Sequence, residues 1–90
     1  MKLTYVQWSD SYGCSSRWGD LDPETVPEEL VCQSVGWVVY ETSKVLTLVP
    51  HISPVPDQTV QGCGDMTIPK CAIKKIIYLE KEVADQGDEG

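Results

Sequence analysis

Residues 30–49 read LVCQSVGWVVYETSKVLTLV, and this stretch decides the fold. Its many valine, tryptophan and tyrosine residues are β-branched or aromatic, a composition that favours extended strands over a helix. Two such runs are separated by a short polar turn at Ser43 and Lys44, which is typical of an antiparallel hairpin. Gly36 within the first run predicts a bulge or a bend. The sequence therefore predicts a β protein organised around this hairpin.

Three further segments complete the expected sheet. Residues 2–8, KLTYVQW, alternate like a strand and are rich in β-branched and aromatic residues. Residues 66–69, MTIP, predict a short strand, and the following KCA predicts a tight turn or a single 3₁₀ turn. Residues 73–82, IKKIIYLEKE, predict the last strand.

A helix is the competing interpretation of residues 71–82, because three isoleucines and a glutamate recur there at helical spacing. We favour a strand, since the segment is short and Ile-Ile-Tyr is β-biased. About five short strands, one tight hairpin and a turn before the last strand indicate an all-β fold, a small, strongly bent antiparallel barrel. An SH3-like or Sm-like barrel has this pattern.

The chain is short enough for one domain only, because its 90 residues can bury a single small core. We expect the barrel domain to span residues 1–80. Residues 9–29 are rich in Ser, Gly, Asp, Pro and Glu without a sustained period, and predict a long N-terminal loop. Residues 81–90 contain little apolar content and predict a disordered acidic tail.

The net charge of the chain disfavours one class of partner. Fourteen acidic and seven basic residues give a formal net charge of -7, which disfavours general nucleic-acid binding. No signal peptide is visible at Met1, and no apolar run reaches the length of a membrane span. We therefore expect a cytoplasmic protein that makes no membrane contact and keeps its four cysteines as free thiols.

Two segments carry a family resemblance: SVGWVVYETSKVLTLVPHIS at residues 34–53 and CGDMTIPKCAIKKIIYL at residues 63–79. They resemble small, mostly uncharacterised proteins encoded by bacteriophages and prophages, which similarly carry a glycine-tryptophan hairpin, a proline-histidine step and an IPK turn before the last strand. The two segments cover less than half of the chain. The resemblance implies a viral setting in the host cytoplasm and offers no catalytic residues to carry over.

The main candidate for a ligand site is PHISPVPDQTVQGCGDMTIPK at residues 50–70, which holds the only histidine and a cysteine between two glycines. Glycine-rich loops present unshielded backbone amides that can form a nest for an anion. His51, Gly64, Asp65 and Lys70 are the candidates here, and Lys70 belongs to a run with three lysines and no acid. The proline-rich residues 50–64 predict a loop, and the structural alternative to a site is a simple turn with solvated lysines.

The long loop adds Arg17 and Trp18, a cation and an aromatic ring suited to stacking on a base. Trp18 either pins its loop to the barrel or forms a binding surface. By contrast, we expect Trp8 and Trp37 to lie in the core, because both lie within strands. The candidate ligand-binding residues are therefore Arg17, Trp18, His51, Gly64, Asp65 and Lys70.

Metal and catalytic sites are weaker candidates. The nearest cysteines, Cys63 and Cys71, are separated by seven residues and lack the close-pair spacing of zinc ligands. One histidine and four cysteines also pair by chance in many sequences, so a cysteine nucleophile is poorly supported. Cys32 and Cys71 lie in apolar runs and are expected in the core. We expect no metal, no other cofactor and no enzymatic activity.

Three functions follow as hypotheses. The first is a phage ligand-binding module that sequesters a nucleotide-like host signalling molecule and so acts against host defence. Its site would form between copies of the chain, because a small barrel encloses little volume. The second is an acidic protein-interaction module that blocks a host protein. The third is a virion or housekeeping component without a ligand.

Overall fold

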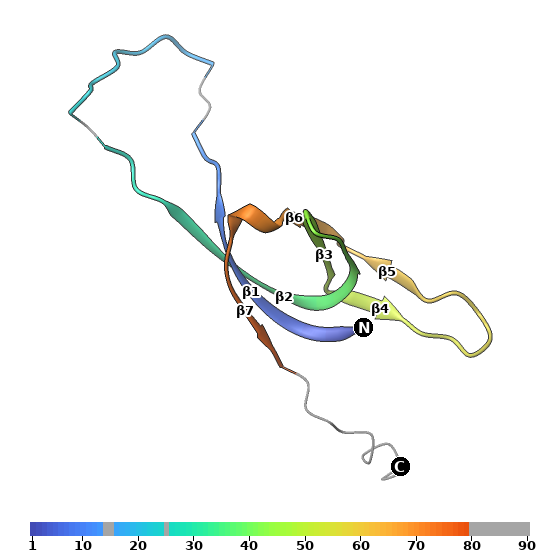
Figure 1. The fold of residues 1–90 in the computed structure, drawn as a ribbon. Coiled ribbons are helices and arrows are strands. Elements are labelled where there is room, and N and C mark those ends of the chain that lie inside the picture. The colour runs from blue at the N-terminus through green and yellow to red at the C-terminus, as the bar shows by residue number, and fades with distance from the viewer. Residues whose placement is uncertain (14–15, 25, 80–90) are drawn as a thin grey trace.

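The structure is a computed structural model that describes residues 1–13, 16–24 and 26–79. Within these ranges the chain forms seven strands and one short helix (Figure 1). In chain order they are β1 (Lys2–Asp10), β2 (Leu30–Glu41), β3 (Val45–Val49), β4 (His51–Ser53), β5 (Gln61–Cys63), β6 (Met66–Pro69), the 3₁₀ helix η1 (Lys70–Ala72) and β7 (Ile73–Tyr78).

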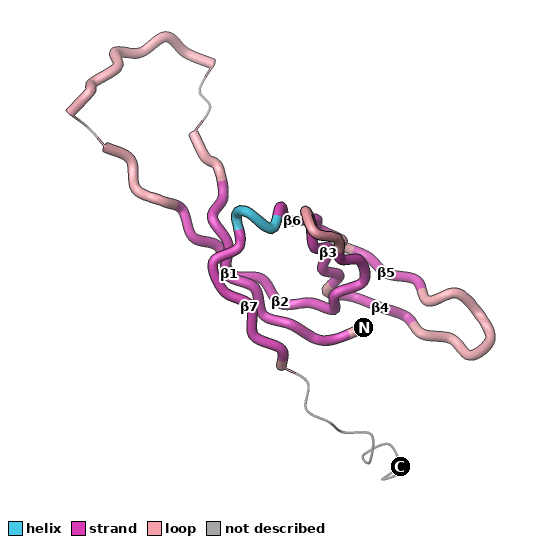
Figure 2. Tube along the Cα trace, viewed as in Figure 1, coloured by secondary structure: helices cyan, strands magenta, loops and turns pink. Residues whose placement is uncertain are grey.

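Five of the strands form one antiparallel sheet in the order β6-β3-β2-β1-β7. β4 and β5 form a separate two-stranded hairpin. The sheet is strongly curved, the loop between β1 and β2 extends from one end of the molecule, and the β4–β5 hairpin extends from the other (Figures 1 and 2). The predicted all-β antiparallel fold and the β2–β3 hairpin are confirmed.

The sheet is not closed into the barrel that the sequence predicted. Its two edges are β6 and β7, which η1 connects without a ladder of hydrogen bonds between them. Pro69 ends β6 without an N–H to donate, and the next residue, Lys70, already belongs to the 3₁₀ helix. The backbone N–H of Lys70 instead donates to the carbonyl of Lys44, 2.8 Å away. The sheet is curved, but strand pairing does not continue from β6 to β7 across this turn.

The core lies on the concave side of the sheet. Alternate residues of β1 and β3 point inward, and Val6, Leu46 and Leu48 are almost fully buried together with Ile68 of β6. Burying one such side chain stabilises the fold by about 1.5–3 kcal/mol. Five further hydrophobic residues are partly buried against this cluster: Trp8, Val38, Met66, Ile73 and Ile76.

Trp8 and Trp37 have different environments, although the sequence placed both in the core. Trp8 packs against the core, and its indole Nε1 donates to Ser34 Oγ at 3.0 Å. Trp37 is half-buried and lies outside the core cluster. It pairs with Leu3 and Val49 on the other face of the sheet, because the strand period alternates the faces of adjacent residues.

Two other expectations are corrected in the same way. Cys71 is exposed on η1 and Cys32 is half-buried, so neither lies in the core. Gly36 pairs in continuous register with Thr4, and the bulge in β2 lies between Val38 and Tyr40. A Cβ at Gly36 would come within 3.0 Å of the Val49 carbonyl oxygen, so this glycine permits a close approach of strands.

The segment after β6 is a 3₁₀ turn followed by a strand, as predicted, and no helix forms between Ile73 and Leu79. The remainder of the helix alternative and the predicted tail at residues 81–90 lie outside the described residues. Within the described residues, no helix has the length and apolar character needed to cross a membrane.

Candidate functional site

Three of the predicted site residues lie together at the base of the β4–β5 hairpin. His51 begins β4, and Gly64 and Asp65 form the turn between β5 and β6. A Cβ added at Gly64 would lie 3.0 Å from Pro50 Cγ and 3.9 Å from His51 Cδ2. Gly64 also has a φ of +83°, in the left-handed region that glycine adopts without a steric penalty. The glycine therefore permits both the turn and its close packing on Pro50 and His51.

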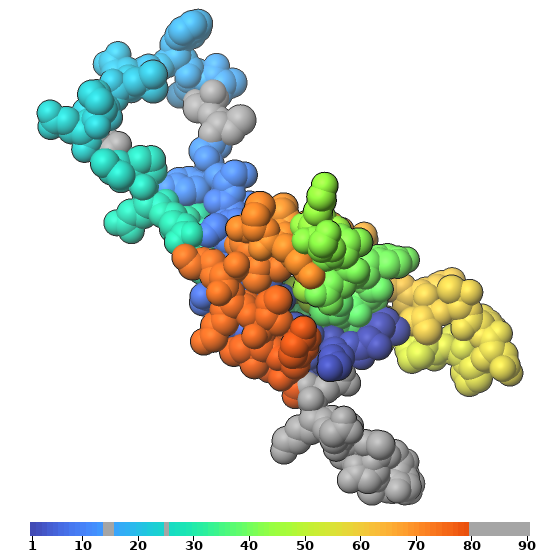
Figure 3. Space-filling view, in the orientation of Figure 1, coloured from blue at the N-terminus to red at the C-terminus, as the bar shows by residue number. Residues whose placement is uncertain are grey.

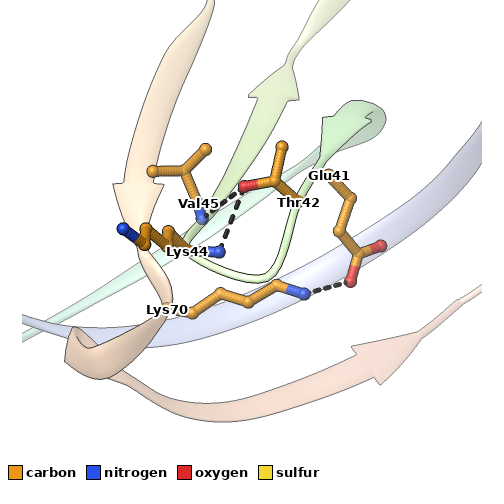
Figure 4. Close-up of polar contacts among 5 residues, drawn as sticks. All are labelled: Glu41, Thr42, Lys44, Val45 and Lys70. Carbon is orange, nitrogen blue, oxygen red and sulfur yellow. Dashed lines mark hydrogen bonds and ion pairs between the residues drawn. The ribbon is translucent and has the colours of Figure 1, made fainter.

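Lys70 is held elsewhere, at the β2–β3 turn. Its Nζ lies 2.7 Å from Glu41 Oε2 in a salt bridge (Figure 4). Beside this pair, Thr42 Oγ1 accepts hydrogen bonds from the backbone N–H groups of Lys44 and Val45, which fixes the turn (Figure 4). The positive charge of Lys70 is therefore engaged by an acid of the same protein.

Lys74, a second lysine of the predicted basic run, is also paired with an acid of the same protein. Lys74 Nζ lies 2.7 Å from Glu29 Oε1, and the Ser9 hydroxyl donates to the other oxygen of the same carboxylate. The hydrogen bonds from Lys74 and then Ser9 lower the pKa of Glu29 below its ordinary value of 4.5. Glu29 therefore joins β7 and β1 to the end of the long loop. This part of the predicted patch serves to anchor a loop.

Arg17 and Trp18 lie in the loop between β1 and β2, at the end of the molecule away from the β4–β5 hairpin (Figures 1 and 3). Trp18 is fully exposed, so it does not pin the loop to the sheet. The shallow hollow beside these two residues is lined only by their own loop neighbours, residues 17–21. The six predicted residues are thus distributed over three places.

A pocket forms where the β4–β5 hairpin meets the sheet, and we call it the hairpin pocket. Its volume is about 340 Å³. Gly62 of β5 rests against the Val49 side chain at the floor of this region, which brings the hairpin close to the end of β3. The lining residues come from the chain start, β2, β3, the hairpin and the turn after it: Met1, Val39, Tyr40, Val49, Ile52, Val60, Gln61, Gly62 and Asp65.

The lining of the hairpin pocket is mostly apolar. Among the described residues, Asp65 is the one carboxylate in the lining, and it is the only predicted site residue there. Tyr40 presents a largely exposed ring, with 72% of its surface accessible. Such a pocket can hold a flat heteroaromatic group and accept hydrogen bonds from its N–H groups at the Asp65 carboxylate.

Sequence reasoning missed every apolar wall of the hairpin pocket. Val39 and Tyr40 were assigned only to a strand, and Ile52 and Val60 were assigned to a proline-rich loop. No local pattern marks these residues, because their proximity depends on how the β4–β5 hairpin folds against the sheet. The only available signal was Asp65, next to a glycine that the turn requires.

Comparison with known proteins assigns no family to the chain. No protein-family model, curated protein or solved structure matches it. Its function must therefore be inferred from its own geometry and chemistry.

Proposed function

We propose that this chain is a binding module that holds the flat, base-like part of a nucleotide-like small molecule in the hairpin pocket. The observation that supports this most directly is the position of Asp65 and Tyr40 in one mostly apolar pocket. A carboxylate accepts N–H groups, which heteroaromatic bases carry on one edge. An exposed tyrosine ring provides a face on which such a base can stack.

The charges that line the hairpin pocket favour recognition of the base of a nucleotide over recognition of its phosphate. Among the described residues, no lysine, arginine or histidine side chain lines the hairpin pocket, and its one charged side chain is the Asp65 carboxylate. Lys70, the cation that the sequence offered for an anion, is paired with Glu41. The volume of about 340 Å³ lies at the small end of the range for ligand pockets, which suits one ring system. Any phosphate would point outward into solvent.

The biological setting of the proposal comes from the sequence. The segments at residues 34–53 and 63–79 resemble phage and prophage proteins, and a phage protein gains from sequestering a host signalling molecule. Sequestration requires affinity only, so the module acts without catalysis. The SH3-like arrangement is part of the same proposal, supported by the strand order and by the 3₁₀ turn between β6 and β7.

A backbone-amide NMR titration tests the proposal with five probes: adenosine, guanosine, their two monophosphates and inorganic phosphate. We expect a nucleoside and its monophosphate to shift the resonances of the β4–β5 hairpin equally, and inorganic phosphate to shift none. Absence of any shift with both nucleosides would contradict base recognition. Equal shifts with inorganic phosphate would show that the pocket binds the phosphate anion and not the base.

Paired variants test the two groups of the pocket. Asp65→Asn exchanges an acceptor oxygen for a donor, so we expect at least a tenfold loss of nucleoside affinity, or about 1.4 kcal/mol. Asp57→Asn is the matched control, because Asp57 lies in the hairpin turn with a φ of +60° that asparagine also tolerates. Tyr40→Ala should weaken stacking, whereas Trp18→Ala at the other end of the molecule should leave affinity unchanged.

A second candidate function is the blocking of a host protein through the β1–β2 loop. Large apolar residues on this loop are strongly exposed: Tyr12, Trp18, Leu21 and Val26. Asp20 and Asp22 flank Leu21, so the loop complements an apolar pocket with a basic rim. Affinity capture at low and high salt tests this candidate: a salt-sensitive partner should be lost with Trp18→Ala and retained with Tyr40→Ala.

A further inference from the structure

The β4–β5 hairpin places a histidine directly opposite a cysteine. Its antiparallel register pairs His51 with Cys63, Ile52 with Gly62 and Ser53 with Gln61. Directly opposed residues of an antiparallel pair have Cβ atoms about 4.5–5.5 Å apart on the same face of the ladder. The imidazole and the thiol therefore project from neighbouring positions, although eleven residues lie between them in the sequence.

This pair lies on the face of the hairpin that is turned away from the hairpin pocket. The neighbouring cross-strand pair, Ile52 and Gly62, faces the sheet, because Ile52 lines that pocket and Gly62 packs against Val49. Since adjacent residues of a strand alternate between faces, His51 and Cys63 project to the other side. Both are exposed, and neither lines the pocket. The pair is therefore separate from the ligand site proposed above.

Two further observations describe access to the sulfur. Cys63 is exposed, so solvent reaches the thiol. The imidazole is close to the β5 side of the hairpin, because its Cδ2 lies 3.9 Å from the position of a Cβ on Gly64. Cδ2 is bonded to Nε2 in the ring, so a nitrogen donor lies near the end of β5 that carries the sulfur.

We propose that His51 and Cys63 form a two-coordinate site for a soft monovalent metal ion, Cu(I). Thiolate sulfur favours soft metal centres, Cu(I) and zinc among them, and imidazole nitrogen is a good copper ligand. Cu(I) accepts two ligands in a near-linear arrangement. On binding, the thiol releases its proton to solvent and the imidazole donates a ring-nitrogen lone pair, while the metal keeps its oxidation state.

The number of donors distinguishes Cu(I) from zinc. In the parts of the chain that the structure describes, no group of three or more His, Cys, Asp or Glu side chains could hold a metal ion together. Zinc sites in proteins use three or four such ligands in a tetrahedral arrangement. A site with one sulfur and one nitrogen on adjacent strands therefore fits the lower coordination number of Cu(I).

The single histidine of the chain makes a clean test possible. Cu(I) is diamagnetic, so the imidazole resonances of the full-length protein can be followed by NMR during an anaerobic titration with Cu(I). We expect the His51 resonances to shift and to saturate at one equivalent of Cu(I). Cys63→Ser should abolish this shift. Cys71→Ser is the matched control and should retain it, because Cys71 is also an exposed free thiol but lies on η1 and not opposite the histidine.

Several outcomes would overturn the site. His51 resonances that stay unchanged while Cu(I) is taken up would show binding by cysteines alone. An equal shift in Cys63→Ser would show that another ligand accompanies the histidine. Saturation at half an equivalent would mean that the ion bridges two copies of the chain. Backbone-amide spectra of each metal-free variant establish that the fold is retained, so a lost shift reports a lost ligand.

Discussion

Gly62 in β5 lies directly against Val49 at the end of β3: a Cβ added at Gly62 would come within 2.8 Å of Val49 Cγ1. Val49 is buried, with 4% of its surface exposed, and its β-branched side chain has little rotamer freedom. This contact fixes the β4–β5 hairpin against the sheet and so forms the floor of the hairpin pocket.

Gly62→Ala should therefore destabilise the protein by about 1–3 kcal/mol, the usual cost of overpacking a filled site. It should also weaken nucleoside binding, because the hairpin has to move away from β3. Gly19→Ala is the control, since no heavy atom lies within 4 Å of a Cβ at Gly19. Urea denaturation of both variants provides the measurement, and equal stabilities would mean that the hairpin is not held by this contact.

The tryptophans should rank by their burial and not by their positions in strands. Trp8→Ala removes a ring that packs against the core and donates to Ser34, so we expect a loss of about 3 kcal/mol. Trp18→Ala removes a fully exposed ring and should change the free energy of unfolding by less than about 0.5 kcal/mol. Chemical denaturation followed by circular dichroism compares them. A large loss with Trp18→Ala would place that ring in a packed environment.

Stability should fall with acidification through the Glu29 carboxylate. The pKa of Glu29 in the folded protein lies below its ordinary value of 4.5, first because of the hydrogen bond from Lys74 and then because of that from Ser9. The stabilisation is therefore fully present above pH 4.5 and is lost as the pH falls through the folded-state pKa. Glu29→Gln should be less stable than the parent protein at neutral pH, and this difference should shrink in acid.

Urea titrations at several pH values measure that difference. Lys74→Met removes the first cause of the pKa shift, so the effect of Glu29→Gln should become smaller in that background. A difference between parent and Glu29→Gln that stays constant from pH 7 to pH 3 would contradict the assignment.

The Lys70→Ala variant distinguishes two candidate ligand sites: the one expected from the sequence, and the hairpin pocket. Lys70 is paired with Glu41 near the surface and does not line the pocket. We expect a loss of less than about 1 kcal/mol in stability, as for other partly exposed salt bridges, and unchanged nucleoside affinity. Calorimetric titration with the nucleoside that binds provides the measurement. Abolished binding with an intact fold would return Lys70 to the site.

The β2–β3 hairpin and the last strand illustrate what local pattern can predict. β-branched and aromatic residues at positions 30–41 and 45–49, with a polar turn between them, favour the same hairpin in any context. Likewise, a 3₁₀ turn before an isoleucine-rich strand was predicted from a few neighbouring residues. These elements depend on interactions within and just beyond each segment, so the sequence by itself determined them.

The β4–β5 hairpin illustrates what local pattern cannot predict. The proline-rich residues 50–64 predict a loop, yet His51–Ser53 and Gln61–Cys63 pair across a turn. Gly62 packs against one side of Val49, and this contact depends on two segments that are distant in sequence meeting in space. The barrel does not close for a related reason: its two edge strands, β6 and β7, do not pair with one another.

Local sequence patterns thus predict an antiparallel β protein, the positions of its main strands, and polar groups close to a required glycine within residues 50–70. The tertiary fold settles which of those groups share a surface. It placed Asp65 in a pocket with Tyr40, put His51 opposite Cys63, and separated Arg17 and Lys70 from both. The physical reason is that strand propensity is a property of neighbouring residues, whereas a site is made by pairings between segments far apart in the chain.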